Sequence, residues 1–588
     1  MGDAADFWSP RFNIETRDDG TIVMEQAEPL PDHLPTLADY LDKWADATPD
    51  QAWLARREGG GDWRKITYGA ARETARRLGA GLLAMGLGPE RPLLILSGNS
   101  LEHGLLGAAC FYVGIPYAPV SPAYSLVSKD HAKLKGIAAL LRPGAVYAED
   151  GAAFAPAIEA IATPGLGVIT LGSGGTVDFD ELAATDPGPA LEARGKVGAE
   201  TVVKYLFTSG STGSPKAVIN TNGMISANQA MVRDCYRFLE KRPPVVLDWA
   251  PWNHTAAGNK VSYMVMTNGG TYYIDDGKPA PGKFDETLRN LREVACTWYF
   301  NVPVGWDLLV GELEGDAALA KTFFSQLGMM FYAGAGMAQH TWDRLRAVAR
   351  KTTGHEVLLA TSLGATETAP FALAITEVQE MSGNVGVPSA GLSMKLVPVG
   401  DKMELRLKGP SITPGYYGDA EKTAEVFDEE GYYCMGDALR PADPGDLGKG
   451  FFFDGRIAEN FKLSTGTWVA VGAVRAALVD QMGGLVRDAV ITGEGEGALG
   501  ALLILSEAAK GMEPAVLKAE LAARLGEAAR AATGSASRVV RAMVLAEEPS
   551  FDRGEVTEKG SLNQRAMRVN HRATIEALYA GEGAVLTV

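Results

Sequence analysis

Apolar residues recur along most of this chain at spacings that alternate between those of helices and those of strands. Within residues 37–49 and 70–87 they recur with helical spacing, which predicts amphipathic helices. Short runs of apolar and aromatic residues predict strands within 91–100, 144–150, 166–172, 244–251, 270–275 and 296–303. Strands that are separated by helices indicate an α/β fold with largely parallel sheets.

The longest apolar stretch, residues 104–120, is interrupted by Gly107, Gly114, Pro116 and Pro119. It is too short and too broken to span a bilayer, so we predict a buried helix that runs into a turn and a strand. The first residues lack the basic region and apolar region that make up a secretory signal. We therefore expect a cytoplasmic protein with no membrane partner.

The amino-acid composition of the chain changes after Gly409. Glycine, proline and acidic residues crowd 410–455, and two strands and an amphipathic helix are predicted between 489 and 532. A chain of 588 residues is too long for one ordinary domain. We predict an α/β protein with a large N-terminal body of several subdomains and mainly parallel sheets, residues 1–454, and a small C-terminal α/β domain, residues 455–588.

Charge and cysteine content exclude several classes of function. The chain carries 55 Lys and Arg against 72 Asp and Glu, a formal net charge of −17. This disfavours nucleic acid and anionic membranes as partners, although local dipoles and a few cations still hold phosphates. The four cysteines are far apart and form no C-x-x-C pair. They indicate reduced thiols and neither a disulfide framework nor a zinc site.

The strongest chemical signal is the run YLFTSGSTGSPKAV, from Tyr205 to Val218. A predicted strand leads into glycines and hydroxyl side chains, which bring N–H and O–H donors to an anion, and a lysine adds charge. The candidate phosphate-binding residues are Thr208, Ser209, Gly210, Ser211, Thr212, Gly213 and Lys216. The spacing is neither that of a Walker A loop nor that of a dinucleotide turn. The alternative, a flexible Ser/Gly linker, is disfavoured by the preceding strand and the Pro-Lys ending.

This run resembles the phosphate-binding signature of the adenylate-forming superfamily, which comprises acyl- and aryl-CoA ligases, stand-alone adenylation domains and firefly-type luciferases. Further matches follow in the family's order: APWNHTAAGN, YAGAGM, LGATETAP, GYYCMGDALRPAD, GRIAENFKLSTGTWV and DRGEVTEKGSLNQ. The resemblance implies a body that binds ATP and an acid, and a mobile C-terminal domain. It also implies the use of ATP, Mg²⁺ and coenzyme A.

In the body, the resemblance implies contacts to the acid and the nucleotide. His254 would lie beside the acyl carboxylate, Thr366 would bond the α-phosphate, and Asp437 would accept hydrogen bonds from the ribose hydroxyls. Glu367 would ligate Mg²⁺, which prefers carboxylate and phosphate oxygens. Leu363 stands where most relatives place an aromatic residue on the adenine. The loop bordering the adenine and the acyl group would include Gly334, Ala335 and Gly336.

Farther along the chain, the resemblance implies residues for both half-reactions. Arg456 would contact the ribose and phosphate, and Lys462 would face the nucleotide during thioester formation. Gly466 would line the pantetheine tunnel, and Ala458 stands at the hinge position. Lys559 resembles the C-terminal catalytic lysine, although T-E-K-G-S replaces the usual T-x-G-K-I.

The identity of the acid is suggested by a finer resemblance. GRIAENFKLSTGTWVAVG lacks the Pro and Glu that commonly follow this motif and, with PWNHTAAGN and SPAYSLVSKDHAKLK, looks like the bacterial feruloyl-CoA synthetase branch. That resemblance implies a small carboxylic acid of the hydroxycinnamate class as substrate. The candidate pocket residues are His254, Trp252, Asn253, Tyr263 and Trp306. Taken singly, each is as readily a structural residue.

Three hypotheses remain open at this stage. The first is an aryl-CoA ligase with a preference for ferulate and related acids. The second is an adenylating enzyme for another aromatic or aliphatic acid, or for another thiol such as carrier-protein phosphopantetheine. The third is a non-catalytic protein that binds acyl nucleotides, which the presence of Lys216, Glu367, Asp437, Arg456 and Lys559 disfavours. A homodimer is compatible with each of them.

Overall fold

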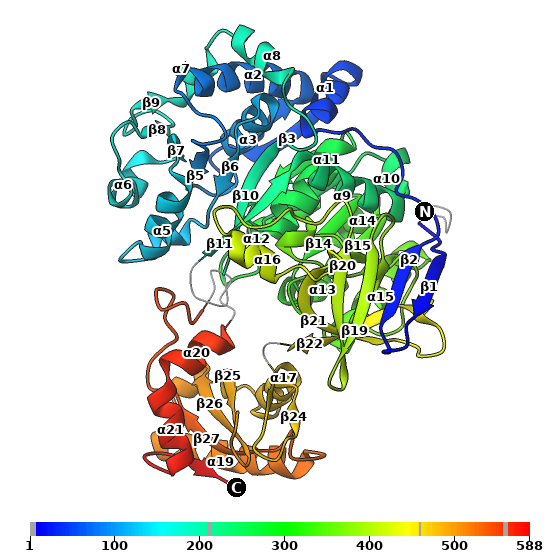
Figure 1. Cartoon of the computed structure of the whole chain (residues 1–588), viewed down its shortest axis with the longest axis vertical. Coiled ribbons are helices and arrows are strands. Elements are labelled where there is room, and N and C mark those ends of the chain that lie inside the picture. Colours follow the sequence, from blue (N-terminus) through cyan, green and yellow to red (C-terminus); the bar gives the residue numbers. More distant parts are fainter. Residues whose placement is uncertain (1–6, 210–214, 458–459, 557–561) are drawn as a thin grey trace.

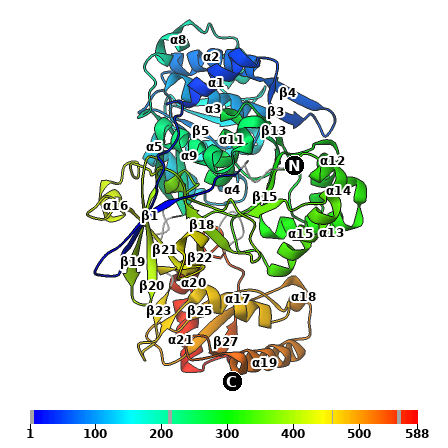
Figure 2. The same ribbon diagram turned by 90° about the vertical axis from the view of Figure 1, so that its right-hand side faces the viewer.

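The computed structural model describes residues 7–209, 215–457, 460–556 and 562–588 of the chain. These residues form a large body and a smaller C-terminal lobe, which lies at the bottom of Figure 1 and joins the body through few connections. The α/β fold class predicted from the sequence is confirmed. Figure 2 shows the same two parts from the side, with the helices of the body packed around its sheets.

A seven-stranded sheet forms the first layer of the body, in the order β11-β10-β6-β5-β7-β8-β9. Its strands pair in parallel except for β10 and β11, which form an antiparallel hairpin. The strands are β5 (Leu93–Ile95), β6 (Tyr117–Pro119), β7 (Ala145–Ala148), β8 (Gly167–Thr170), β9 (Val177–Asp178), β10 (Val202–Ser209) and β11 (Pro215–Thr221).

Helices cover this sheet, and the apolar stretch at 104–120 is one of its buried parts. As predicted, it forms a helix, a turn at Gly114 in the left-handed conformation, and strand β6. The helices of this region are α1 (Leu37–Ala47), α2 (Tyr68–Ala84), α3 (Leu101–Val113), α4 (Ala123–Leu126), α5 (Ala132–Leu141), α6 (Gly151–Ala160), α7 (Phe179–Ala183), α8 (Gly188–Arg194), α9 (Asn222–Cys235) and α10 (Phe238–Lys241).

Two smaller sheets complete the α/β part of the body. The first has the order β12-β13-β3-β4, and the second, β14-β15-β16, is entirely parallel. Their strands are β3 (Ala52–Arg57), β4 (Trp63–Thr67), β12 (Val245–Asp248), β13 (Thr271–Ile274), β14 (Trp298–Asn301), β15 (Met329–Tyr332) and β16 (Leu358–Ala360). The helical segments between them are η2 (Ala256–Val261), α11 (Ser262–Thr267), α12 (Phe284–Glu293), α13 (Pro303–Gly315), α14 (Ala317–Phe324) and α15 (Gln339–Thr353).

An eight-stranded antiparallel sheet, which the sequence pattern did not predict, occupies the remaining part of the body. It joins two strands near the N-terminus to strands that lie between residues 373 and 456. Its strands are β1 (Phe12–Thr16), β2 (Ile22–Gln26), β17 (Leu373–Ala374), β18 (Asn384–Pro388), β19 (Ser393–Val399), β20 (Lys402–Lys408), β21 (Tyr433–Pro441) and β22 (Phe451–Arg456). The short helical segments beside it are η3 (Thr366–Thr368), α16 (Ala420–Glu425) and η4 (Leu447–Lys449).

The C-terminal lobe has a hydrophobic core of its own, with members from Phe461 to Leu586. Its strands are β23 (Phe461–Lys462), β24 (Trp468–Val469), β25 (Val486–Thr492), β26 (Leu499–Leu505), β27 (Val539–Val544) and β28 (Leu586–Thr587). Its helices are α17 (Val471–Gln481), α18 (Glu507–Lys510), α19 (Pro514–Ala531), α20 (Gln564–Asn570) and α21 (Arg572–Ala580). The predicted boundary between 454 and 455 falls within β22 and stays a prediction. No helix among the described residues is long and apolar enough to cross a membrane.

Candidate functional site

The candidate phosphate-binding residues lie at the end of the β10–β11 hairpin. Thr208 pairs with Lys216 across the two strands, and Ser209 pairs with Pro215. The predicted residues Gly210, Ser211, Thr212 and Gly213 lie outside the described residues. The antiparallel pairing therefore brings the two ends of the predicted loop together, with the lysine on one strand opposite the threonine on the other.

Lys216 and Glu367 meet at the same aromatic ring. The Nζ of Lys216 lies 5.3 Å from the ring centroid of Tyr416, whose hydroxyl donates to Glu367 Oε1 at 2.9 Å. Thr413 N donates to the Glu367 carbonyl at 2.8 Å, so both the side chain and the backbone of Glu367 are held by hydrogen bonds. Burial lowers the pKa of the Lys216 amine. A cation and a buried carboxylate are thus placed together beside the predicted phosphate loop.

Glu367 is the residue that the resemblance predicts as a magnesium ligand, and this role stays a prediction. Among the described residues, no group of three or more His, Cys, Asp or Glu side chains could hold a metal ion. A single carboxylate is still suitable for Mg²⁺, because this ion keeps several waters and takes its other ligands from substrate phosphates. The donor set therefore fits a metal that arrives with a nucleotide.

A tight turn precedes Thr366, and a hydrogen bond links this region to the predicted adenine segment. A Cβ on Gly364 would lie 1.4 Å from the Pro370 carbonyl oxygen, so the turn before Thr366 requires glycine. The hydroxyl of Thr361 donates to the Tyr332 carbonyl at 2.8 Å. This bond joins the residues just before the LGATETAP segment to the predicted adenine loop. In that loop, Gly334, Ala335 and Gly336 are exposed, and Gly334 has a φ of +92°.

The structure pairs the two predicted ribose-contacting residues directly. Asp437 and Arg456 are opposite each other on the neighbouring strands β21 and β22. Arg456 Nε lies 3.3 Å from Asp437 Oδ1. The arginine side chain is 64% exposed whereas the aspartate is 6% exposed, so the guanidinium is accessible from outside and the carboxylate is fixed behind it.

His254 begins a tight helical turn that continues into the π-helical segment η2. Gly258 N donates to the His254 carbonyl at 2.7 Å, and a Cβ on Gly258 would lie 2.0 Å from the Trp252 carbonyl oxygen. The turn therefore requires glycine at this position. Lys204 of β10 is 1% exposed, and its Nζ donates to the Gly258 carbonyl at 2.8 Å. A buried hydrogen bond thus joins the strand that leads to the phosphate loop with the turn that carries His254.

Two of the other predicted pocket residues are buried aromatic side chains that bond to tyrosines of the body. Trp252 Nε1 donates to the Tyr272 hydroxyl at 3.1 Å. The hydroxyls of Tyr263 and Tyr117 are 2.9 Å apart. Both side chains therefore already have polar partners within the protein, and their contact with an acid stays a prediction.

The last two predicted pocket residues differ in exposure. Trp306 is buried, and its Nε1 donates to the Phe331 carbonyl at 3.0 Å. Asn253 is partly exposed beside Trp252. Contact of Trp306 or Asn253 with an acid likewise stays a prediction.

In the C-terminal lobe, Lys462 and Gly466 are exposed on the β23–β24 hairpin. Lys462 Nζ lies 4.9 Å from the ring centroid of Trp468 in the same hairpin, and Gly466 has a φ of +83°. The predicted hinge residue Ala458 and the predicted catalytic Lys559 lie outside the described residues.

The described residues on either side of Lys559 are held together. Val556 and Leu562 form a β-bridge, and Asn563 N donates to the Glu555 carbonyl at 2.8 Å. The Glu555 side chain is fully buried and accepts hydrogen bonds from Ser550 N at 2.7 Å and Arg553 Nε at 2.9 Å. The two ends of the segment that contains Lys559 therefore have a fixed separation.

The segment before Glu555 also contacts the body. Ser128 Oγ donates to Asp552 Oδ1 at 2.7 Å, and Lys133 Nζ donates to the Phe551 carbonyl at 3.2 Å. The Lys133 Nζ also lies 4.5 Å from the ring centroid of Phe551. The body's partner in this contact is the SPAYSLVSKDHAKLK segment. Ser128, Lys133 and Asp552 lie in runs quoted for the family resemblance, but the sequence did not predict their contact. Tyr416 was not predicted either, because its place beside Glu367 depends on pairing between distant parts of the chain.

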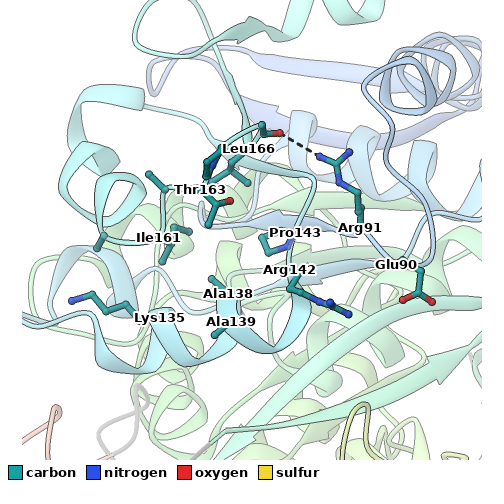
Figure 3. A pocket seen from close by; sticks show the side chains of 14 residues that line it. Glu90, Arg91, Lys135, Ala138, Ala139, Arg142, Pro143, Ile161, Thr163 and Leu166 are labelled. Carbon is teal, nitrogen blue, oxygen red and sulfur yellow. Dashed lines mark hydrogen bonds between the residues drawn. The ribbon is translucent and has the colours of Figure 1, made fainter.

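One cavity lies elsewhere on the body. It has a volume of about 730 Å³ and is shown in Figure 3. Arg91 at its edge donates to the Gly165 carbonyl at 3.3 Å. The cavity is lined by residues just before β7 and β8, which is the amino end of these parallel strands. Ligands of open α/β sheets bind outside the carboxyl ends of the strands, so we do not assign the nucleotide to this cavity.

The described residues thus form an α/β body that carries the candidate nucleotide-binding residues, and a separate C-terminal lobe. Comparison with known proteins agrees with this description. Residues 41–417 match the AMP-binding enzyme family, and residues 461–583 match the AMP-binding enzyme C-terminal domain. The chain belongs to the AMP-binding enzyme family, and the matched families support an adenylate-forming acid–thiol ligase that binds ATP.

Individual relatives differ in the acid that their names specify. A feruloyl-CoA synthase of Amycolatopsis sp is 28% identical over 381 residues, covering 63% of this chain and 70% of that protein. A sulfoacetate–CoA ligase of Cupriavidus necator is 26% identical over 519 residues, covering 84% and 93%. The ATP-bound MatB structure from Rhodopseudomonas palustris has a TM-score of 0.68 at 21% identity, covering 91% of this chain and 99% of that one.

We predict that Tyr416→Phe weakens the use of magnesium. The variant keeps the ring beside Lys216 but removes the hydrogen bond to Glu367. Because a hydrogen bond to a charged group is involved, we expect the Mg²⁺ concentration for half-maximal pyrophosphate release to rise by about tenfold. Tyr417→Phe is the matched control, since its ring packs on Tyr205 at 4.7 Å. Equal effects of the two variants would contradict the assignment.

We predict that Asp552→Ala slows adenylation more than thioester formation. The variant removes the bond from Ser128 and with it part of the contact that places the lobe against the body. Pyrophosphate release should fall by about three- to tenfold, whereas conversion of supplied acyl-adenylate to thioester should change little. Asp480→Ala, on the exposed face of α17, is the control. A uniform loss in both assays would count against a role for this contact in lobe placement.

Proposed function

We propose that this protein is an AMP-forming carboxylate–CoA ligase that acts on ferulate and related hydroxycinnamates. The observation that carries the proposal is the meeting of Lys216, Tyr416 and Glu367 beside the phosphate hairpin. This arrangement supports the binding of a triphosphate at the hairpin, because a cation and a carboxylate suited to a metal ion both contact Tyr416 there. The reaction class is supported by the family, and the acid and the thiol are the finer parts of the proposal.

The first half-reaction turns a poor electrophile into a good one. An oxygen of the acid attacks the α-phosphorus of ATP, the bond to the β-phosphate oxygen breaks, and pyrophosphate leaves. Thr366 and Lys559 would hold the α-phosphate, and residues 208–216 would hold the β- and γ-phosphates. A Mg²⁺ ion bound at Glu367 would neutralise phosphate charge. Positioning and electrostatic stabilisation are sufficient for this step, so no side chain has to act as a covalent nucleophile.

The remaining nucleotide contacts hold the product of this step. Asp437 would accept hydrogen bonds from the ribose hydroxyls, and Arg456 would contact the ribose and the phosphate. His254 would lie beside the acyl group and limit access to it. The loop containing Gly334, Ala335 and Gly336 would border the adenine, and small residues there permit a close approach of the ligand to the backbone.

The second half-reaction needs a different approach to the acyl group. The CoA sulfur attacks the acyl carbon, the bond from that carbon to the phosphate oxygen breaks, and AMP leaves. We propose that the lobe turns about the segment near Ala458, so that Lys559 leaves and the hairpin with Lys462 and Gly466 enters. A hinge of this kind is a common way to separate two chemical steps at one site.

Support for a hydroxycinnamate comes from the resemblance to feruloyl-CoA synthase and from the aromatic surroundings of η2. The first experiment is an ATP-, Mg²⁺- and CoA-dependent thioester assay with ferulate, p-coumarate, benzoate, octanoate and acetate. Thioester formation that is highest with ferulate supports the whole proposal. Pyrophosphate release without thioester would retain adenylation and exclude CoA as the acceptor. Absence of both products with every acid would contradict the proposed substrate class.

We predict that Lys559→Ala separates the two half-reactions. Removal of the cation at the α-phosphate should lower acyl-adenylate formation by about 100-fold, as expected for loss of one group that stabilises developing charge. Conversion of supplied acyl-adenylate to thioester should persist. Lys462→Ala is the reciprocal control and should slow the second assay more than the first. An equal loss of both activities in Lys559→Ala would show that the assignment of this lysine is wrong.

A further inference from the structure

A buried lysine lies between three of the predicted site segments. Lys260 is on η2, shortly after His254, and is 2% exposed. Its Nζ lies 3.3 Å from the ring centroid of Phe331 and 4.5 Å from that of Phe371. Phe331 comes directly before the predicted adenine loop, and Phe371 follows the LGATETAP motif. The acid, adenine and phosphate segments therefore converge on this amine.

Three buried donors around this position have no hydrogen-bond partner in the part of the chain that the structure describes. They are Lys260 Nζ, the Tyr236 hydroxyl and Trp298 Nε1. The ring centroids of Trp298 and Tyr236 lie 5.8 Å and 5.9 Å from Lys260 Nζ. Buried polar atoms are normally paired, because an unpaired one keeps the cost of its lost hydration.

Lys204 is a buried lysine of the same region whose amine does have a hydrogen-bond partner. It is as deeply buried as Lys260, and its Nζ lies 4.5 Å from the ring centroid of Tyr263. Unlike Lys260, it donates a hydrogen bond to the Gly258 carbonyl at 2.8 Å. Aromatic rings compensate only part of the desolvation of an amine. Burial lowers the pKa of both lysines well below the usual value, and of the two only Lys204 has a hydrogen-bond partner among the described residues.

We propose that Lys260 determines substrate specificity by binding the phenolic oxygen of a hydroxyaryl acid, at the end of the substrate far from its carboxylate. This inference rests on the proposed function. Phe331, Phe371 and Trp298 suit a planar ring, and Tyr236 supplies a second polar group for the ring oxygen. The flexible four-carbon stem of the lysine allows its amine to move as the ring enters.

The spacing along the chain agrees with an extended substrate. His254 and Lys260 are six residues apart, in the first half of a helical stretch in which η2 continues directly into α11. Helical backbone advances by at most roughly 9 Å over this interval. That is of the same order as the separation of the carboxylate and the para oxygen in an aryl propenoic acid. His254 and Lys260 can therefore contact the two polar ends of one substrate.

The test compares p-coumarate with cinnamate, which differ only in the ring hydroxyl. We expect Lys260→Met to lower the ratio of their kcat/KM values by about tenfold or more, because the variant keeps the length of the stem and removes the amine. Tyr236→Phe, which removes one oxygen, should lower the same ratio by a few-fold, as for one neutral hydrogen bond. Near-ultraviolet circular dichroism and Tm confirm that each variant is folded.

Lys204→Met is the matched control. This lysine is equally buried but has a structural partner, so its loss should affect both acids to the same extent. If Lys260→Met also lowers kcat/KM equally for both acids, Lys260 is structural and the proposal is wrong. Dependence on Lys260 with sulfoacetate and not with p-coumarate would likewise overturn it, because the amine would then bind a different acid.

Calorimetric binding of the two acids without CoA separates this inference from the proposed function. Tighter binding of p-coumarate than of cinnamate, lost in Lys260→Met, supports the inference even if no thioester forms. A second outcome is that p-coumarate forms a thioester, but binding and kcat/KM are the same in wild type and in Lys260→Met. That outcome retains the proposed function and rejects the role of Lys260. Failure of the wild type to bind either acid rejects the inference.

Discussion

The hydrogen bond from Lys204 to the Gly258 carbonyl is the constraint on which the candidate site depends. Lys204 is in β10, the strand that leads to the phosphate loop, and Gly258 is in the turn after His254. Burying an amine at 1% exposure is costly unless its donors are used. The bond and the neighbouring tyrosine rings offset part of that cost. They also fix the two segments, so the groups expected to hold the phosphate and the acid keep one relative position.

Local patterns predicted much of the fold because they reflect local physical causes. The helix at 37–47, most strands of the seven-stranded sheet and the helix at 514–531 follow from apolar periodicity and are found where expected. The eight-stranded antiparallel sheet could not be predicted in this way. It pairs β2, near the N-terminus, with β19, and such a pairing has no signal within a short window of sequence. The glycine-rich composition of residues 410–455 is atypical of strands, so β21 and β22 were not predicted either.

The residues of the candidate site likewise divide into those that a local pattern could predict and those that depend on long-range contacts. The motif residues Lys216, Glu367, Asp437 and Arg456 could be selected from the sequence because each belongs to a short recognisable run. Tyr416, which contacts Lys216 and Glu367, could not be selected. Its position depends on a bridge between Val218 and Tyr416, in segments about 200 residues apart. Lys260 could not be selected from the sequence for another reason. A lysine in sequence is expected at the surface, and only its burial among aromatic rings reveals a polar group that needs a partner.

The contact between the lobe and the body is suited to a movable part. The C-terminal lobe has its own core, so its internal stability does not depend on where it sits. Its described contacts near Asp552 are the packing of Phe551 against Tyr124 and Lys133 of the body, and two hydrogen bonds between partly exposed polar groups. Water can replace such bonds at small cost, unlike the buried bond of Lys204. A ligand that binds the two lobe positions with different affinities can then shift the population between them. The rigid link within the body and the weak link between the parts would thus serve two successive reactions at one site.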